Sequence, residues 1–340
     1  MKRHVLTMIG AVSIAGLALA GCSGDPLGGD ATNAAGGDAT AADCTTTTPL
    51  SVVVAPIQFE PTYIAKNQGY FAEECLDVTI VTGGSATQNI AQLVSGQVQF
   101  ATVSIGALIT SEAQGVPVVA VVGNAYTSDK NPTSGIVVKA SSDIKTVSDL
   151  VGRTVGIQGL NTGSETAMFI AMEKAGVDPL GAERVEVPST GMQTALDQGT
   201  VDAVLASSPQ YQVLAEDTTD YRVISNPSTE FLAGVPVTPF GAMKSWLDAN
   251  ADTANRYIAA MKKADDYYND PANADSILDI TAEVSQQDRT KLTAASLAPV
   301  SAAIDLAKTK LQVDAYTKYG IVTTPVTVDQ IIWSGAPTTN

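Results

Sequence analysis

Two parts of the chain repeat one spacing of residues, and this repeat constrains the fold more than any other feature. The first copy is Leu93-x-x-Gly96-x-Val98 followed by Ser104, and an offset of 103 at all four positions gives Leu196-x-x-Gly199-x-Val201 followed by Ser207. Each copy predicts a helix that stops at glycine, then a strand, then a helix begun by a hydroxyl residue. Chance similarity in an Ala-, Val- and Ser-rich chain is the alternative. The constant spacing favours two similar α/β lobes.

Strand and helix signals alternate around this repeat. Strands are predicted at 51–55, 78–81, 98–103, 116–122, 136–138, 154–157, 185–187, 201–205 and 221–224. Helices are predicted at 61–74, 85–94, 105–114, 166–175, 192–196 and 211–215, and the chain is mostly helical over 246–319. Such alternation indicates parallel sheets covered on both faces. A length of 340 residues exceeds what one core usually organises, about 250–300 residues, so at least two lobes are expected.

Composition excludes several functional classes. There are 35 acidic residues against 19 basic ones, a net charge of −16. Nucleic acid as a partner is excluded, because binding it needs a basic surface. A polybasic patch for membrane surfaces is excluded for the same reason. The single histidine, His4, lies in an N-terminal segment that we expect to be cleaved, so the mature protein would have none. This excludes Ser-His-Asp and Cys-His catalysis and histidine metal sites. We therefore expect no catalytic residue, no metal and no cofactor.

The N-terminus has the features of an export signal. Lys2 and Arg3 precede an apolar run from Val5 to Ala20 that is too short for a convincing membrane span. The sequence Leu19-Ala20-Gly21-Cys22 resembles the lipobox of bacterial lipoproteins, which implies removal of residues 1–21 and lipidation of Cys22. An ordinary secretory signal cut elsewhere is the alternative. We expect a palmitate-type anchor on the extracytoplasmic face of the cell membrane, with residues 22–48, rich in Gly, Ala, Asp and Thr, as a flexible tether.

Two further cysteines, Cys44 and Cys75, remain. In an exported protein, an isolated pair is predicted to form a disulfide. The alternative is two free thiols, because a sequence cannot show that two Cα atoms approach within about 7 Å.

Polar residues at strand-to-helix junctions are the candidate ligand contacts. In open α/β sheets ligands bind beyond the carboxyl ends of strands, where the free N–H groups of helix N-termini converge. Ser85, Thr162, Ser104 and Ser207 stand at such junctions, and Ser85-x-x-Gln88, Thr190-x-x-Gln193 and Thr162-x-x-Glu165 match the capping-box pattern. The alternative for each is a plain helix cap without a ligand.

Several segments together resemble a known family. They are Tyr63–Phe71, Leu76–Val78, Leu93–Val98, Ala113–Val119, Leu150–Val155, Met172–Pro179 and Leu196–Ala203. Their order and spacing are similar to the solute-binding proteins of ABC importers, in the group that binds nitrate, sulfonates, taurine and the thiamine pyrimidine precursor. Cys75 departs from the resemblance, since many relatives have glycine there after a helix. A disulfide at this position is one way to fix the turn instead.

The resemblance implies a two-lobed periplasmic-binding-protein-like fold of type II, with the ligand cleft between lobes joined by a hinge. Lobe one is expected at 49–137 plus 239–325, lobe two at 138–238, and a C-terminal tail at 326–340, with crossings near Lys139 and Pro239. The implied ligand-binding residues lie in the pocket loops of both lobes: Gln58, Phe59, Gly84, Ser85, Ser104, Tyr126, Thr127, Asn161, Thr162, Gly163, Ser164, Ser207 and Phe240. The implied protein is a monomer without enzyme activity that delivers a solute to an ABC permease and its ATPase.

The ligand is expected to be a small polar organic nutrient, either sulfonate- or taurine-like or aminopyrimidine-like. The pocket loops contain no arginine for an anion, and Phe59, Tyr126 and Phe240 are candidates to stack on a ring. Glu60 and Glu165 are candidates to receive an amino group, although we favour a solvated Glu60 and a capping Glu165. Two other classes stay open: an exported carboxylate-dependent hydrolase, and a ligand-sensing lipoprotein without transport.

Overall fold

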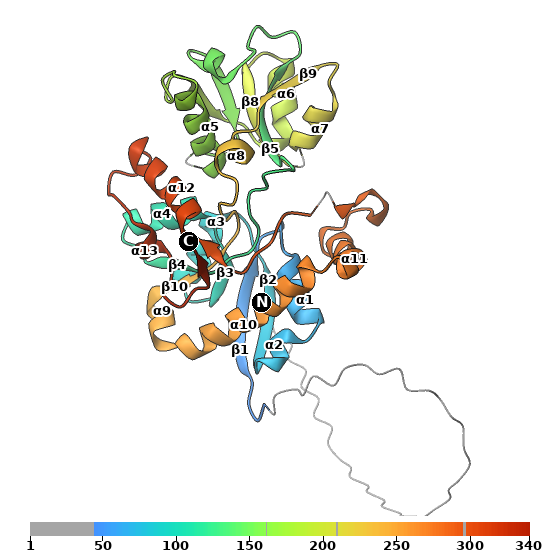
Figure 1. Ribbon diagram of the computed structural model, residues 1–340, viewed down its shortest axis with the longest axis vertical. Coiled ribbons are helices and arrows are strands. Elements are labelled where there is room, and N and C mark those ends of the chain that lie inside the picture. The colour runs from blue at the N-terminus through green and yellow to red at the C-terminus, as the bar shows by residue number, and fades with distance from the viewer. Residues whose placement is uncertain (1–43, 161, 209, 295–296) are drawn as a thin grey trace, which may run out of the picture. The chain divides into compact units, whose positions relative to one another are not determined.

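Two five-stranded sheets form the framework of the chain (Figure 1). The computed structural model describes residues 44–160, 162–208, 210–294 and 297–340. These residues belong to one compact unit, and Cys22, the expected signal and most of the expected tether lie outside them. The rest of this section concerns that unit.

The first sheet has the strand order β2-β1-β3-β10-β4. Its strands are β1 (Thr48–Val54), β2 (Leu76–Thr82), β3 (Phe100–Thr102), β4 (Val118–Val122) and β10 (Phe240–Met243). Strands β2, β1 and β3 are parallel, whereas β10 is antiparallel to both β3 and β4. Val52 of β1 stands opposite Ile80 of β2 and Phe100 of β3. Alternate β1 residues face two cores, with Val52 in one and Val53 in the other, so both faces of the sheet are covered.

The second sheet repeats the plan of the first, with the order β7-β6-β8-β5-β9. Its strands are β5 (Ser134–Lys139), β6 (Thr154–Ile157), β7 (Glu183–Glu186), β8 (Ala203–Ser207) and β9 (Tyr221–Ser225). Strand β5 is antiparallel to its neighbours β8 and β9, as β10 is in the first sheet. The two copies of the sequence repeat lie at the corresponding strands β3 and β8. Two matched α/β units are therefore confirmed, but each sheet is mixed rather than wholly parallel.

Helices and short strands complete the unit. Those next to the first sheet are α1 (Glu60–Asn67), α2 (Tyr70–Glu73), α3 (Ala86–Val94), α4 (Ile105–Ala113), α9 (Lys244–Ala249), α10 (Ala251–Asn269), α11 (Ala274–Ser285), α12 (Leu306–Lys318) and α13 (Val328–Ile331), with β11 (Ile304–Asp305) and β12 (Thr338–Thr339). Those next to the second sheet are α5 (Gly163–Lys174), α6 (Met192–Asp197), α7 (Gln210–Glu216) and α8 (Pro227–Phe231). Short 3-10 turns lie at Val147–Leu150, Ser189–Gly191, Pro271–Asn273 and Arg289–Lys291. Among the described residues no helix combines the length and hydrophobicity needed to cross a bilayer.

Three predicted boundaries are wrong. Strand β5 belongs entirely to the second sheet, so the first crossing ends before Ser134 and not near Lys139. The second crossing does end beside Pro239, where β10 begins. The helix predicted over 61–74 is two helices, because Gly69 adopts a left-handed φ of 80° between α1 and α2. Residues 326–340 are not a loose tail, since Ile331 is fully buried and β12 pairs with β11.

The predicted helix caps are partly correct. Ser85 forms a complete capping box with Gln88, and Gly96 and Gly199 both adopt the left-handed conformation expected of helix stops. Thr190 caps nothing, because Ser189–Gly191 form a 3-10 turn and α6 begins at Met192 without a side-chain cap. A residue in a 3-10 turn cannot also hold the extended backbone of an N-cap.

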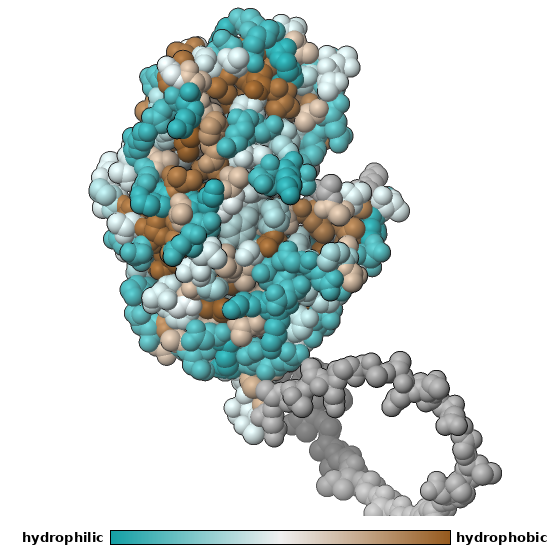
Figure 2. Space-filling view, in the orientation of Figure 1, coloured by the Kyte–Doolittle hydropathy of each residue, from teal (hydrophilic) through white to brown (hydrophobic). Residues whose placement is uncertain are grey.

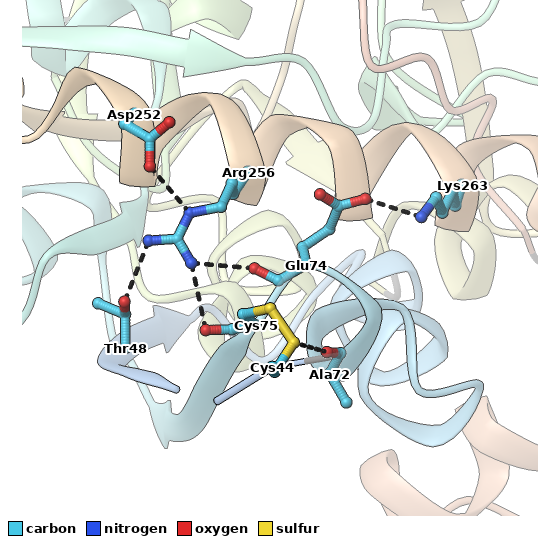
Figure 3. The surroundings of a disulfide bond; sticks show 8 residues. All are labelled: Cys44, Thr48, Ala72, Glu74, Cys75, Asp252, Arg256 and Lys263. Atoms are coloured by element: carbon cyan, nitrogen blue, oxygen red, sulfur yellow. Dashed lines mark hydrogen bonds and ion pairs between the residues drawn. A yellow bond between two sulfur atoms is a disulfide. The ribbon is translucent and has the colours of Figure 1, made fainter. Parts of the chain in front are cut away.

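The Cys44–Cys75 disulfide is present, with the two Cα atoms 5.5 Å apart (Figure 3). Cys75 has a φ of 54°, so it occupies the left-handed position where glycine is usual. Hydrogen bonds hold this turn from both sides. The Thr48 N–H donates to the Cys75 carbonyl at 2.9 Å, and the Arg256 guanidinium donates to the Glu74 and Cys75 carbonyls at 3.0 and 3.2 Å. The bridge thus fixes the start of β1 against the end of α2.

The left-handed turn at Cys75 predicts an order of stability among variants that lack the bridge. We expect Cys44→Ser/Cys75→Gly to be more stable than Cys44→Ser/Cys75→Ala by about 1 kcal/mol, because glycine avoids the left-handed penalty while gaining some unfolded-state entropy. Both should be less stable than wild type by about 3–4 kcal/mol in the chain-entropy model of a disulfide. Guanidinium unfolding monitored by circular dichroism measures the order. Equal stability of the two double variants would contradict this account of the turn.

Candidate functional site

The connections between the sheets identify the edge where a ligand site can form. The first crossing runs from the end of β4 at Val122 to Ser134, which pairs with Ser207 at the end of β8. The second crossing ends at Phe240, which pairs with Thr102 at the end of β3. Both crossings therefore join the carboxyl edge of one sheet to the carboxyl edge of the other. These edges are where helix N-termini and strand ends supply ligand contacts in α/β proteins.

A buried amide organises the carboxyl edge of the first sheet. Asn89 of α3 is fully buried, and its Oδ1 accepts a hydrogen bond from the Gly84 N–H at 2.9 Å. Its Nδ2 donates to the Thr102 carbonyl at 2.8 Å. The Thr102 hydroxyl in turn accepts from the Ala55 N–H at 2.7 Å. One side chain thus links the ends of β1, β2 and β3, which sets the spacing of the junctions that follow them.

The predicted first-lobe junction residues lie where these strands end. Ser104 follows β3, is half-buried, and accepts a hydrogen bond from the Ala107 N–H at 3.1 Å as the cap of α4. Ser85 is exposed and caps α3. A Cβ added to Gly84 would clash with the Gln88 Oε1, so a side chain there would push Gln88 out of the capping box. These three residues share one edge, which satisfies the geometric requirement for a common site.

Gln58 and the crossings meet at the same edge. Gln58 has a left-handed φ of 53°, and its side-chain Oε1 accepts from the Thr238 hydroxyl at 2.8 Å. Its carbonyl accepts from the Asn124 Nδ2 at 2.9 Å. Phe59 follows as the first residue before α1, but it is 96% buried and packs edge-on against Tyr63. Phe59 therefore belongs to the core under the junction and does not offer its ring to a ligand.

The second-sheet junction residues are arranged less uniformly. Thr162 caps α5 by accepting from the Glu165 N–H at 3.2 Å, and Gly163 and Ser164 begin that helix at the end of β6. Asn161 lies outside the described residues. Ser207 is the last residue of β8 and is half-buried, but it does not cap α7, which begins at Gln210. The prediction of a hydroxyl cap at Ser207 is wrong, although the residue does lie at the carboxyl edge.

A cavity of about 720 Å³ lies beside the crossings. Tyr126 and Thr127 of the first crossing line it, together with Gly234 of the second crossing. The opposite wall comes from the helical segment, including Tyr268 and Ile277. In Figure 2, hydrophobic surface gathers over the α11 region. The cavity is in the size range of small-molecule sites, roughly 300–1,000 Å³.

The cavity and the first-sheet junction are neighbours through α11. Ile277 of this helix lines the cavity, and Thr281, one turn further along it, donates to Glu60, the residue after Phe59, at 3.0 Å. The cavity walls carry charges of both signs, with Lys130 and Lys308 against Asp129 and Asp270. No excess of positive charge therefore selects an anion. The Tyr126 hydroxyl donates to the Ala303 carbonyl, and burial raises the Tyr126 pKa, so this phenol stays protonated.

Phe240 and both acidic candidates need correction. The Phe240 ring is fully buried and packs against Tyr257, so it belongs to the core and does not face a ligand. Glu60 is not solvated but buried, with its carboxylate accepting from the Thr281 hydroxyl at 3.0 Å. Glu165 is fully buried and forms an ion pair with Arg184 at 3.2 Å instead of completing a capping box. Burial against a partner explains both acidic side chains without a ligand.

Sequence reasoning missed the amides of Asn89 and Asn124. An Asn inside a predicted helix is a weak signal, because the same residue is common on exposed helix faces. Asn124 follows the apolar β4 run directly, and this position at the end of a buried strand is the signal that was available. Among the residues that the structure describes, no group of three or more His, Cys, Asp or Glu side chains is placed to hold a metal ion.

Comparisons with known proteins give one family. Residues 57–274 match the family model described as NMT1/THI5 like. The formylaminopyrimidine-binding protein of Halalkalibacterium halodurans is 31% identical over 159 residues, which is 46% of this chain and 46% of that protein. The riboflavin-binding protein RibY of Chloroflexus aurantiacus is 30% identical over 123 residues, covering 36% of this chain and 34% of that protein. The chain thus spans about half or less of the length of these curated relatives.

Solved structures of similar fold include two sulfonate-binding proteins. The periplasmic aliphatic sulphonate binding protein SsuA of Escherichia coli has a TM-score of 0.70 at 19% identity, covering 86% of this chain and 99% of that chain. The alkanesulfonate-binding protein SsuA of Xanthomonas axonopodis pv. citri, bound to MOPS, has a TM-score of 0.67 at 16% identity, covering 85% and 99%. The predicted periplasmic-binding-protein fold is confirmed.

The burial of Glu60 predicts a pH-dependent effect of its replacement. Burial raises the Glu60 pKa above its ordinary 4.5, so the folded protein holds this proton more tightly than the unfolded chain does. The stability linked to Glu60 is therefore present at low pH and is lost as pH rises through the raised pKa. Glu60→Gln should gain stability relative to wild type as the pH increases from about 4 to about 8.

Urea unfolding of both proteins across this pH range measures the difference. Glu283→Gln, at an exposed position of α11, is the matched control and should show little change with pH. A constant difference between Glu60→Gln and wild type at every pH would contradict the assignment.

Proposed function

The chain belongs to the NMT1/THI5-like family, and from this premise we propose that it is the extracytoplasmic solute-binding component of an ABC importer. It captures one small organic nutrient at the facing carboxyl edges of its two sheets, closes by movement at the crossings, and delivers the ligand to a permease. It acts by binding alone and not as an enzyme. Cys22 anchors it by a lipid at the outer face of the cell membrane, and the protein works as a monomer.

The observation that carries this proposal is the extent of the family match. Residues 57–274 contain both sets of junction residues, both crossings and most strands of both sheets. The matched part of the chain therefore includes the junctions and both crossings of the candidate site. Ligand capture between two such units needs no reactive side chain, because helix N-termini and backbone N–H groups supply the contacts.

We further propose that the ligand is a nitrogen heterocycle of the aminopyrimidine kind and not a sulfonate. The named binding proteins that resemble this chain in sequence are for formylaminopyrimidine and riboflavin, whereas the sulfonate-binding proteins resemble it at under 20% identity. Tyr126 and Tyr268 offer aromatic surface at the cavity, and Gln58 and Ser104 offer neutral hydrogen-bonding groups. Neutral polar groups and rings suit a flat heterocycle better than a compact anion.

Isothermal titration against a panel of compounds tests the ligand class. The panel contains formylaminopyrimidine, riboflavin, taurine, MOPS and nitrate. We expect formylaminopyrimidine to bind most tightly, with a negative heat-capacity change from burial of the ring. Tighter binding of MOPS or taurine would contradict the proposed heterocycle and indicate a sulfonate as the ligand. No heat with any compound would remove both classes.

A bulky residue at the first-sheet junction should block the site. Ser104→Trp is expected to abolish binding of the compound that wild type binds, because the half-buried Ser104 lies at the end of β3. Its cost in stability is limited to about 1 kcal/mol from the lost cap. The control is Ser95→Trp. Ser95 is exposed and follows the C-terminus of α3, at the end of that helix away from the Ser85 junction. Unchanged affinity in Ser104→Trp would place the ligand elsewhere.

A further inference from the structure

Three segments that are distant in sequence meet through three side chains. Gln58 lies between β1 and α1, Asn124 lies on the first crossing, and Thr238 lies on the second crossing. The Asn124 Nδ2 is 2.9 Å from the Gln58 carbonyl and 3.0 Å from the Thr238 hydroxyl. The Thr238 hydroxyl donates to the Gln58 Oε1 at 2.8 Å. Each member of this triad contacts the other two.

Two members of the triad, Asn124 and Thr238, are buried, whereas Gln58 is half-buried, and one buried acceptor has no partner. Asn124 is 1% exposed and Thr238 is 6% exposed. The Asn124 Oδ1 has no hydrogen-bond partner, although it is shielded from solvent. An unpaired buried acceptor costs stability, so apolar residues of the same shape would make an equally good core. The polar triad therefore needs an explanation other than stability.

Backbone hydrogen bonds show what the triad holds in place. The two crossings pair with each other over 125–127 and 234–237, as in the Thr127 N–H to Val235 carbonyl bond at 3.0 Å and the Val237 N–H to Ala125 carbonyl bond at 2.8 Å. The first crossing also pairs with 299–302, through the Ser301 N–H to the Asn124 carbonyl at 2.9 Å. The first-sheet halves of both crossings thus form one hydrogen-bonded ribbon.

The second-sheet halves of the crossings lack this ribbon. α8 stays with the second sheet, because the Ser134 and Ser228 hydroxyls are 3.1 Å apart and Asn226 donates to the Ser134 carbonyl at 2.9 Å. Between the ribbon and these contacts lie residues 128–133 and 232–233, and Gly234, the first ribbon residue of the second crossing, has a left-handed φ of 82°. Helix α12 also packs on α5, where Tyr319 lies edge-on to Phe169 and its hydroxyl donates to Glu173 at 2.8 Å. Bending at the crossings therefore also requires α5 to move against α12.

We propose that the triad is a brace that fixes both crossings to the ligand junction of the first sheet. Hinge bending is thereby confined to residues 128–133 and 232–233, on the second-sheet side. Because Gln58 belongs to both the brace and the ligand junction, Asn124 and Thr238 are positioning residues that couple ligand contact to closure. The coupling to a ligand rests on the proposed function, whereas the position of the bend does not.

Spin-label distances between the sheets test the brace without a ligand. Nitroxides are attached to ketone amino acids encoded at Val94 of α3 and Val213 of α7, both about half-exposed, so that no cysteine is used. Wild type should give one narrow distance distribution. Thr238→Val, which removes one hydroxyl at constant shape, should broaden or shift it, and Asn124→Leu should do so more strongly. Thr309→Val is the matched control, because this buried hydroxyl bonds only within the start of α12, to the Asp305 carbonyl.

Affinity supplies the second measurement. For the panel compound that wild type binds, Thr238→Val should weaken binding about 5- to 30-fold, because it removes the hydrogen bonds to the Asn124 Nδ2 and the Gln58 Oε1, and Thr309→Val should not. A Thr238→Val protein with wild-type distances and affinity would overturn the brace, and so would equal broadening in Thr309→Val. If no panel compound binds wild type, the proposed ligand class fails, while the distances in the ligand-free proteins still decide the brace.

Discussion

The antiparallel strand in each sheet is the constraint on which the rest of the structure depends. Because β5 and β10 run against their neighbours β8 and β3, each crossing must enter its sheet at the carboxyl edge. Helix N-termini, strand ends and both connections are thereby brought to the same two edges. A wholly parallel arrangement would send each connection to the amino edge and separate the junctions from the crossings. The location of the candidate site follows from this strand direction more than from any individual side chain.

The far edge of the first sheet has a different role. Strand β1 begins beside Cys75, where the disulfide, the Thr48 backbone and Arg256 hold the turn after α2 (Figure 3). Parallel strands begin at one edge of a sheet and end at the other, so this linkage lies away from the Gln58 and Ser104 junctions. The described chain therefore starts at the edge opposite the candidate site. The disulfide and Arg256 thus reinforce one edge of the sheet, and the polar junctions lie at the other.

Much of the fold could be predicted from the sequence because it depends on local patterns. The 103-residue repeat located β3 and β8, and the glycine stops at Gly96 and Gly199 were correct, since a left-handed stop is a local requirement. The antiparallel β5 was not predictable, because a buried strand of either direction has the same apolar pattern. The first crossing was misplaced for that reason.

The candidate site was only partly predictable, because its organisation depends on contacts between distant residues. Ser104 and Thr162 were identified from local capping patterns. Asn89 and Asn124 were not, since their partners lie on other strands and crossings. Phe240 was misassigned because a pattern of aromatic residues does not distinguish a stacking surface from the core. The predictions of a solvated Glu60 and a capping Glu165 were wrong for a similar reason. Each side chain has a tertiary partner that spacing along the chain does not reveal.

A crystal structure of the protein grown with its bound solute tests the central claim most directly. We predict that the ligand lies between the carboxyl edges of the two sheets, with polar atoms within hydrogen-bond distance of the Gln58 and Ser104 junction and of the α5 N-terminus. A ligand bound at an outer helix face or at the amino edge of either sheet, with the carboxyl edges empty, would contradict the account.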